Sequence, residues 1–237
     1  MMLPDKKITI ISGHYGTGKT EFAVNLAIRM AREGQKTTLV DLDIVNPYFR
    51  SFERKRELEK EGVEVLVTSR QGKIDIPALP AEIMKIFSHD HKKSIIDVGG
   101  DPVGARVLGY YKTQLDTVPH NFWFCVNHNR PENRSKDQVI QYIKETEQLS
   151  RQPVTGLINT THLGRETEEN DIIKGDAFVA DIASTLELPF IYTVGEEKFE
   201  SLLEGRLQAS FFPIRIYMIK PWELDDAKGG HFAWLEE

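Results

Sequence analysis

The stretch "SGHYGTGKT", Ser12–Thr20, decides the fold expected for this chain. It follows the apolar run Lys7–Ser12, and it precedes Thr20–Glu33, whose apolar residues recur with the period of a helix. Its last eight residues fit the pattern G-x-x-x-x-G-K-[ST]. Glycines let backbone N–H groups face phosphate oxygens, and the helix that follows directs its positive end at the same anion. A strand, this loop and a helix in that order predict a phosphate-binding loop.

The rest of the chain alternates in the same way. The expected strands are apolar on consecutive residues, which is typical of parallel strands buried on both faces by helices. They are Lys7–Ser12, Lys36–Asp43, Val63–Thr68, Lys93–Val98, Asn121–Asn127, Pro153–Asn159 and Pro189–Val194. Further helices are expected near Glu132–Leu149 and Asp171–Leu186. Alternating strands and helices predict an α/β domain with a doubly wound, mostly parallel sheet.

Composition predicts one ordinary globular domain. The chain has 237 residues, of which 40% are hydrophobic and 28% charged. We expect a single nucleotide-binding domain over residues 1–237, with a core of about 7–194 and a C-terminal extension of about 195–237. The net charge of −6 argues against a general nucleic-acid or anionic-membrane binder, and no sequence-specific nucleic acid is expected as a partner. The sequence shows no signal peptide and no membrane-length apolar run, which predicts a cytoplasmic protein.

In a doubly wound sheet, ligands bind beyond the carboxyl ends of the strands. After the first strand, Lys19 is expected to reach the β- and γ-phosphates, and the Thr20 hydroxyl to bind Mg²⁺. The loop residues expected to bind nucleotide are Gly13, His14, Tyr15, Gly16, Thr17, Gly18, Lys19 and Thr20. The one cysteine, Cys125, lies in the apolar run of the fifth strand and is interpreted as a small buried hydrophobe.

Carboxylates follow two other strands. Asp41 and Asp43 end the second strand, and one of them is expected to reach the site, where it holds Mg²⁺ through water or orients the attacking water. Asp97 ends the fourth strand and fits a second carboxylate of the metal site. The glycine-rich segment 99–104 after it is expected to sense the γ-phosphate, with a plain glycine turn as the alternative.

Asn159 ends the sixth strand, where its amide is suited either to reading a base edge or to forming a turn. The N-K-x-D pattern of GTP-specific sites is absent, because the residues after Asn159 are Thr160, Thr161 and His162. ATP is therefore the expected nucleotide.

Taken together, these motifs resemble the MinD/ParA/Mrp group of P-loop ATPases, which includes the nitrogenase iron protein and the nickel-insertion ATPase CooC. The resemblance runs from about Lys7 to Val194. It rests on "GTGKTEFAVNLAIRMAREGQKTTLVDLDI", "SIIDVGGDPVGA", "FCVNHNRPENRSKDQV" and "GLINTTHLG".

The resemblance implies an ATP-dependent homodimer that acts on a protein client and is reset by hydrolysis, with ATP and Mg²⁺ as cofactors. It makes Lys19 the phosphate lysine and Thr20 the magnesium ligand. Asp43 would orient the water, Asp97 would reach the metal through water, and Asn159 would contact adenine.

The chain also departs from the group. His14 stands where the group has a lysine that reaches the partner subunit's nucleotide, and it either does that work in a pH-sensitive form or caps the loop. Glu21, after "GKT", replaces Ser or Thr and is expected to turn to solvent. Gly104 replaces a cluster-ligand cysteine of the nitrogenase iron protein, which removes an iron–sulfur cluster from consideration. The acidic, glycine-containing tail after Ile219 disfavours membrane targeting.

Two other functions remain open. Dethiobiotin synthetase and the cobyrinate amidases share this fold and a related loop, so an ATP-dependent metabolic enzyme that activates a small carboxylate is one alternative. The other is a nucleotide-sensing module that does not hydrolyse ATP, in which His14 marks the loss of catalysis.

Overall fold

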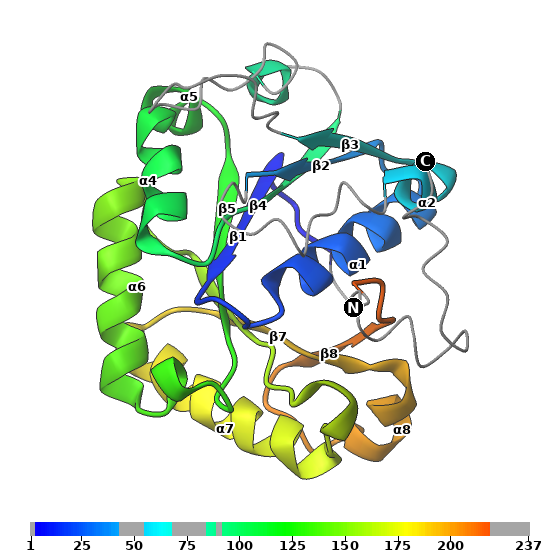
Figure 1. The fold of residues 1–237 in the computed structure, drawn as a ribbon, viewed down its shortest axis with the longest axis vertical. Helices are drawn as coiled ribbons and strands as arrows, with labels where there is room; N and C mark the ends of the chain where they lie inside the picture. The colour runs from blue at the N-terminus through cyan, green and yellow to red at the C-terminus, as the bar shows by residue number, and fades with distance from the viewer. Residues whose placement is uncertain (1–2, 43–54, 68–83, 89–91, 219–237) are drawn as a thin grey trace, which may run out of the picture.

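The computed structural model describes residues 3–42, 55–67, 84–88 and 92–218. Its centre is an eight-stranded sheet in the order β3-β2-β4-β1-β5-β6-β7-β8, and every adjacent pair is parallel (Figure 1). The strands are β1 (Ile8–Gly13), β2 (Thr37–Asp41), β3 (Val63–Val67), β4 (Lys93–Asp97), β5 (His120–Val126), β6 (Gly156–Asn159), β7 (Phe190–Glu196) and β8 (Ser210–Ile214). The predicted doubly wound parallel sheet is therefore confirmed.

The sheet extends one strand beyond the seven that the sequence predicts. β8 lies in the stretch assigned to the C-terminal extension and pairs with β7 at the edge of the sheet. Its sequence, SFFPI, contains Pro213, which has no backbone N–H. Proline is tolerated at an edge, where one side of the strand makes no ladder, and it hides the strand from a pattern-based prediction.

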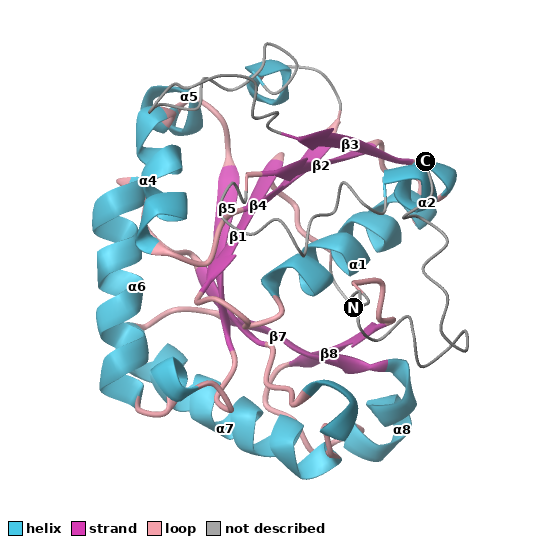
Figure 2. Cartoon of the chain, in the orientation of Figure 1, coloured by secondary structure: helices cyan, strands magenta, loops and turns pink. Residues whose placement is uncertain are grey.

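Helices cover both faces of the sheet, as the colouring by secondary structure shows (Figure 2). They are α1 (Lys19–Arg32), α2 (Lys55–Lys60), α4 (Pro102–Tyr110), α5 (Lys112–Asp116), α6 (Lys136–Ser150), α7 (Glu169–Leu186) and α8 (Glu200–Leu203). Short 3₁₀ turns are η2 (Lys85–Phe87), η3 (Pro131–Asn133), η4 (Gly164–Glu166) and η5 (Glu197–Phe199). Among the described residues, no helix has the length and apolar character needed to cross a bilayer.

The two faces bury separate apolar cores. α1 packs on one face, where Phe22 and Leu26 meet Leu39 and Ile95 of the strands. α4, α6 and α7 pack on the other face, and α4 and α6 lie side by side (Figure 1). Because the strands are covered on both faces, consecutive strand residues are buried, as they are along the whole of β1.

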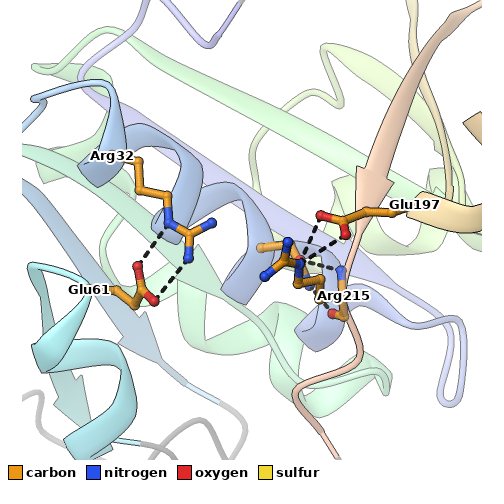
Figure 3. A network of polar contacts seen from close by, with 5 residues as sticks. Arg32, Glu61, Glu197 and Arg215 are labelled. Atoms are coloured by element: carbon orange, nitrogen blue, oxygen red, sulfur yellow. Dashed lines mark hydrogen bonds and ion pairs between the residues drawn. The ribbon is translucent and has the colours of Figure 1, made fainter.

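Two exposed ion pairs connect segments on the surface, one at the end of α1 and one after β8. Arg32 donates through Nε and Nη2 to the two carboxylate oxygens of Glu61, at 2.8 and 2.9 Å (Figure 3). Beyond β8, Arg215 donates through Nε to both oxygens of Glu197, each at 2.9 Å (Figure 3). Both pairs are exposed, so each contributes at most about 1 kcal/mol to stability.

Candidate functional site

The loop between β1 and α1 is closed by its own backbone. β1 ends at Gly13, and Gly18, with φ of +82°, caps the first turn of α1. The backbone N–H of Thr17 donates to the carbonyl of His14 at 3.2 Å, and the Thr17 hydroxyl donates to the same oxygen at 2.8 Å. Lys19, the first residue of α1, is 5% exposed. The loop thus surrounds the start of a helix, which favours an anion.

The predicted magnesium ligands Thr20 and Asp97 lie together. The Thr20 hydroxyl, in the first turn of α1, donates to Oδ2 of Asp97 at 2.6 Å. Asp97 ends β4, where it is 1% exposed and pairs in register with Asp41 of β2. Hydroxyl and carboxylate oxygens are the ligands that Mg²⁺ prefers, so this donor set fits the ion. The third predicted carboxylate, Asp43, lies outside the described residues.

Two side chains from other loops rest on the glycines of the phosphate-binding loop. Nε of Arg130, which follows β5, donates to the Gly16 carbonyl at 2.8 Å. The imidazole of His162, which follows β6, lies over Gly18, because a β-carbon built there would be 3.2 Å from Nε2. Thr160 approaches the same point, at 4.0 Å. Residues after three strands therefore meet at this loop.

His14 makes its main side-chain contact within its own chain. Its ring lies 4.8 Å, centroid to centroid, from the ring of Tyr142 on α6. The Tyr142 hydroxyl donates to the Gly100 carbonyl at 3.0 Å. Burial raises the pKa of Tyr142 to about 12, so this hydroxyl keeps its proton at neutral pH.

Gly100 itself packs directly on the loop. A β-carbon at Gly100 would lie 2.7 Å from the backbone nitrogen of Tyr15 and 3.0 Å from the carbonyl carbon of His14. The glycine after β4 is therefore required by a close approach of two backbones. The following helix, α4, is fixed by Asp101, whose carboxylate accepts from the backbone N–H of Gly104 at 2.6 Å. The segment expected to sense the γ-phosphate is thus in contact with the loop.

Asn159 is placed differently from the expectation of a base contact. It is fully buried, and its Nδ2 donates to the carbonyl of Ile172 at 3.2 Å and to the Thr193 hydroxyl at 3.4 Å. Its Oδ1 accepts from the backbone N–H of Thr161 at 3.0 Å. These bonds tie β6 to α7 and β7, whereas Thr160 and His162 approach the loop. Contact of Asn159 with adenine stays a prediction.

The expectation that Glu21 turns to solvent was wrong. Its carboxylate accepts from the backbone N–H groups of Tyr217 and Met218, at 2.8 and 3.0 Å. Asn25, one turn along α1, donates to the carbonyl of Arg215 at 2.9 Å and accepts from its N–H at 2.9 Å. The segment after β8 offers backbone donors that a short polar side chain at position 21 would not reach. The first turns of α1 therefore hold this segment against the helix.

Sequence reasoning assigned no role to Arg130, Tyr142 or His162. Two of them follow β5 and β6, so the rule that ligands bind beyond the strand ends could have indicated them. Tyr142 lies inside α6, and only the packing of α6 beside the loop brings it to His14. The sequence carries no local signal for that contact.

Cys125 is buried beside the loop, as the sequence predicts. It pairs in register with Gly13, and its carbonyl oxygen would be 2.5 Å from a β-carbon on that glycine. Burial raises the pKa of the Cys125 thiol, which keeps it protonated and unreactive. Within the described part of the chain, no group of three or more His, Cys, Asp or Glu side chains is arranged to hold a metal ion.

Comparison of the sequence with family models gives a match over residues 4–90 to the ParA family, described as NUBPL iron-transfer P-loop NTPase. This range contains the phosphate-binding loop, α1 and β2, and it is less than half of the chain. No curated protein sequence matches the chain.

Solved structures of P-loop proteins share the fold. The signal recognition particle 54 kDa protein of Aeropyrum pernix, in complex with GDP, matches with a TM-score of 0.53 and 22% identity over 79% of this chain and 41% of its own. FtsY of Thermotoga maritima matches with a TM-score of 0.51 and 21% identity, over 80% of this chain and 62% of its own. Chloroplast FtsY of Physcomitrella patens matches with a TM-score of 0.55 and 18% identity, over 80% of this chain and 58% of its own.

The chain spans 41% to 62% of the length of these three structures. At such identities the likeness is one of fold. The chain therefore has the fold of the P-loop nucleoside triphosphatases, and its residues 4–90 are similar to the ParA family model.

Proposed function

We propose that this protein is a nucleotide-dependent switch that binds Mg·ATP, dimerises on binding, acts on a protein client and is reset by hydrolysis. The observation that carries the proposal is the hydrogen bond of 2.6 Å between Thr20 and Asp97 beside the closed loop. It places a hydroxyl and a carboxylate next to the buried Lys19, which is the arrangement that Mg²⁺ and a polyphosphate require together.

Each residue has a defined part in this proposal. The loop amides and Lys19 hold the phosphates, and Thr20 with Asp97 holds Mg²⁺, which neutralises charge on the leaving diphosphate. Asp43 positions the attacking water or holds the metal through water, as the sequence predicts. ATP is preferred to GTP because the N-K-x-D pattern is absent after β6. We further propose that the protein works in the cytoplasm and does not bind membranes.

The packing of the 99–104 segment on the loop supports a switch. Gly100 touches the backbone of His14 and Tyr15, so a γ-phosphate bound at this end of the loop meets both segments. Two discrete arrangements of such a segment, with and without the γ-phosphate, are the usual basis of nucleotide switching.

Calorimetry with Mg·ATP, Mg·ADP and Mg·GTP tests nucleotide binding. The wild type is expected to bind Mg·ATP, and Lys19→Ala is expected to lose that binding. In Asp97→Asn the affinity for ATP should no longer rise when Mg²⁺ is added, because an amide oxygen is a poorer ligand than a carboxylate. Asp137→Asn, an exposed position on α6, is the matched control. Unchanged ATP affinity in Lys19→Ala would overturn the assignment.

Sizing in solution with and without Mg·ATP, together with phosphate release, tests the switch. A dimer that forms with Mg·ATP and dissociates after hydrolysis supports the proposal. His14→Lys, measured in parallel, is expected to dimerise or hydrolyse more readily if position 14 faces the partner's nucleotide. A chain that turns over ATP only with a small acid, and stays monomeric, contradicts the switch.

A further inference from the structure

Arg130 lies directly on the phosphate-binding loop. Its Nε donates to the Gly16 carbonyl at 2.8 Å. A β-carbon built on Gly16 would be 2.8 Å from both Cζ and Nη2 of Arg130. The guanidinium therefore occupies the space that a side chain at position 16 would enter, while the φ of +73° at Gly16 is what favours glycine there.

The loop after β5 holds Arg130 in this position. Asn127, which is fully buried, accepts through its carbonyl from the backbone N–H of Arg130 at 3.1 Å and from Nδ2 of Asn133 at 3.2 Å. The Asn127 side chain accepts from the N–H of Asn129 at 3.0 Å and donates to the carbonyl of His162 at 3.2 Å. The backbone at Arg130 is thus fixed before any ligand arrives, which lowers the entropic cost of using its side chain.

The guanidinium of Arg130 has no carboxylate partner in the part of the chain that the structure describes. Among the described residues, no carboxylate lies within ion-pair distance of Arg130, and its Nη1 and Nη2 make no hydrogen bond. An arginine is charged at every physiological pH and offers a planar fork of donors. Lys19 and the start of α1 lie on the same loop and are also positive. An anion bound at this loop would stabilise the charge of the Arg130 guanidinium.

The position of Arg130 along the loop indicates which end of a bound polyphosphate its guanidinium would contact. Gly16 is one residue from Tyr15, whose backbone touches Gly100 of the segment after β4. Gly18, in contrast, caps α1. Arg130 is therefore at the end of the loop that faces the 99–104 segment.

We propose that Arg130 binds the terminal phosphate of the bound nucleoside triphosphate, with Nε anchored on Gly16 and the terminal nitrogens on the phosphate. This inference rests on the proposed function, and it adds a phosphate-binding residue supplied by the loop after β5. Bidentate, charged hydrogen bonds of this kind are about twice as strong as neutral ones.

Arg130→Gln separates the two halves of this side chain. Glutamine carries an N–H donor at the chain position of Nε, so it keeps the bond to Gly16 while it removes the fork and the charge. Arg130→Lys keeps the charge and removes the fork. Arg134→Gln, at an exposed arginine of the same loop, is the matched control.

The measurements are the affinities for Mg·ATP and Mg·ADP by calorimetry and the melting temperature without nucleotide. Arg130→Gln is expected to bind Mg·ATP about 10- to 100-fold more weakly, to lose much less affinity for Mg·ADP and to melt with the wild type. The affinity of Arg130→Lys for Mg·ATP should lie between those of the wild type and Arg130→Gln. Arg134→Gln should have the wild-type affinities and melting temperature.

Either of two results would overturn the inference. One is an affinity of Arg130→Gln for Mg·ATP equal to that of Arg134→Gln. The other is an equal loss for both nucleotides with a lowered melting temperature, which would make Arg130 a brace of the loop only. A wild-type chain that binds neither nucleotide would instead refute the proposed function, and this inference with it.

Discussion

The ring of His14 lies 4.8 Å, centroid to centroid, from the ring of Tyr142. The hydroxyl of the same tyrosine donates to the Gly100 carbonyl oxygen at 3.0 Å, so Tyr142 contacts both His14 and Gly100. Tyr142 also packs on Phe124 of β5, with ring centroids 5.9 Å apart. α6 therefore joins the loop to the segment after β4 through one side chain. In this arrangement His14 is linked through Tyr142 to the segment after β4.

Replacing Tyr142 by Phe should loosen the 99–104 segment. The change keeps both ring contacts and removes the donor to Gly100, whose buried carbonyl then lacks this bond. We expect a loss of about 1 kcal/mol of stability and faster amide hydrogen exchange over 99–104, with exchange in α6 unchanged. Tyr110→Phe, at a tyrosine that is 54% exposed on α4, is the control. Equal exchange in the two variants would show that the hydroxyl does not hold this segment.

The same substitution should change the response to alkali. Burial raises the pKa of Tyr142 to about 12, above its ordinary value near 10. The folded chain therefore keeps this proton in a range where the unfolded chain loses it. The resulting stability is complete below about pH 10 and is lost as the pH rises toward 12. Between about pH 10 and 12, the denaturation midpoint of Tyr142→Phe should fall less steeply with rising pH than that of the wild type. Parallel plots of midpoint against pH for the two proteins would contradict this prediction.

The succession of seven strands along the chain and the position of the phosphate-binding loop could be predicted from the sequence because both depend on local signals. Consecutive apolar residues mark buried strands, and the glycine and lysine spacing marks the loop. The rule that strand ends meet at one edge of a parallel sheet led to the expectation that Thr20 and Asp97 share one site, and their side chains are hydrogen-bonded in the structure. These predictions needed no knowledge of which strands are neighbours.

The contacts that were missed join residues far apart in the chain. Arg130 and Gly16 are separated by 114 positions, and Glu21 and Tyr217 by 196. Each depends on which loops the sheet order brings together, and β8 was itself absent from the prediction. The role of the Glu21 carboxylate can be recognised only when the segment after β8 is known to lie beside α1.

Glu21→Ala should release that segment. The substitution leaves the N–H groups of Tyr217 and Met218 without their acceptor, at a cost of about 2 kcal/mol of unfolding free energy. We also expect faster cleavage by trypsin after Arg215, which only Asn25 and the exposed ion pair with Glu197 would then hold among the described residues. Glu132→Ala, at an exposed position in η3, should change neither quantity. Cleavage at Arg215 at the wild-type rate would mean that Glu21 does not fasten this segment.

The buried carboxylate of Asp176 on α7 is expected to stabilise the β7–β8 edge of the sheet through its hydrogen bonds. It is 2% exposed, and its carboxylate accepts from the Thr193 hydroxyl at 2.6 Å and from the backbone N–H of Gln208 at 2.8 Å. Asp176→Asn keeps the volume but turns an N–H₂ group toward one of these donors, so chemical denaturation should show a loss of about 1–3 kcal/mol. Asp181→Asn, on the same helix in an exposed pair with Lys136, should lose less than about 1 kcal/mol. If the two variants unfold at the same denaturant concentration, the buried carboxylate does not hold β8 to the sheet.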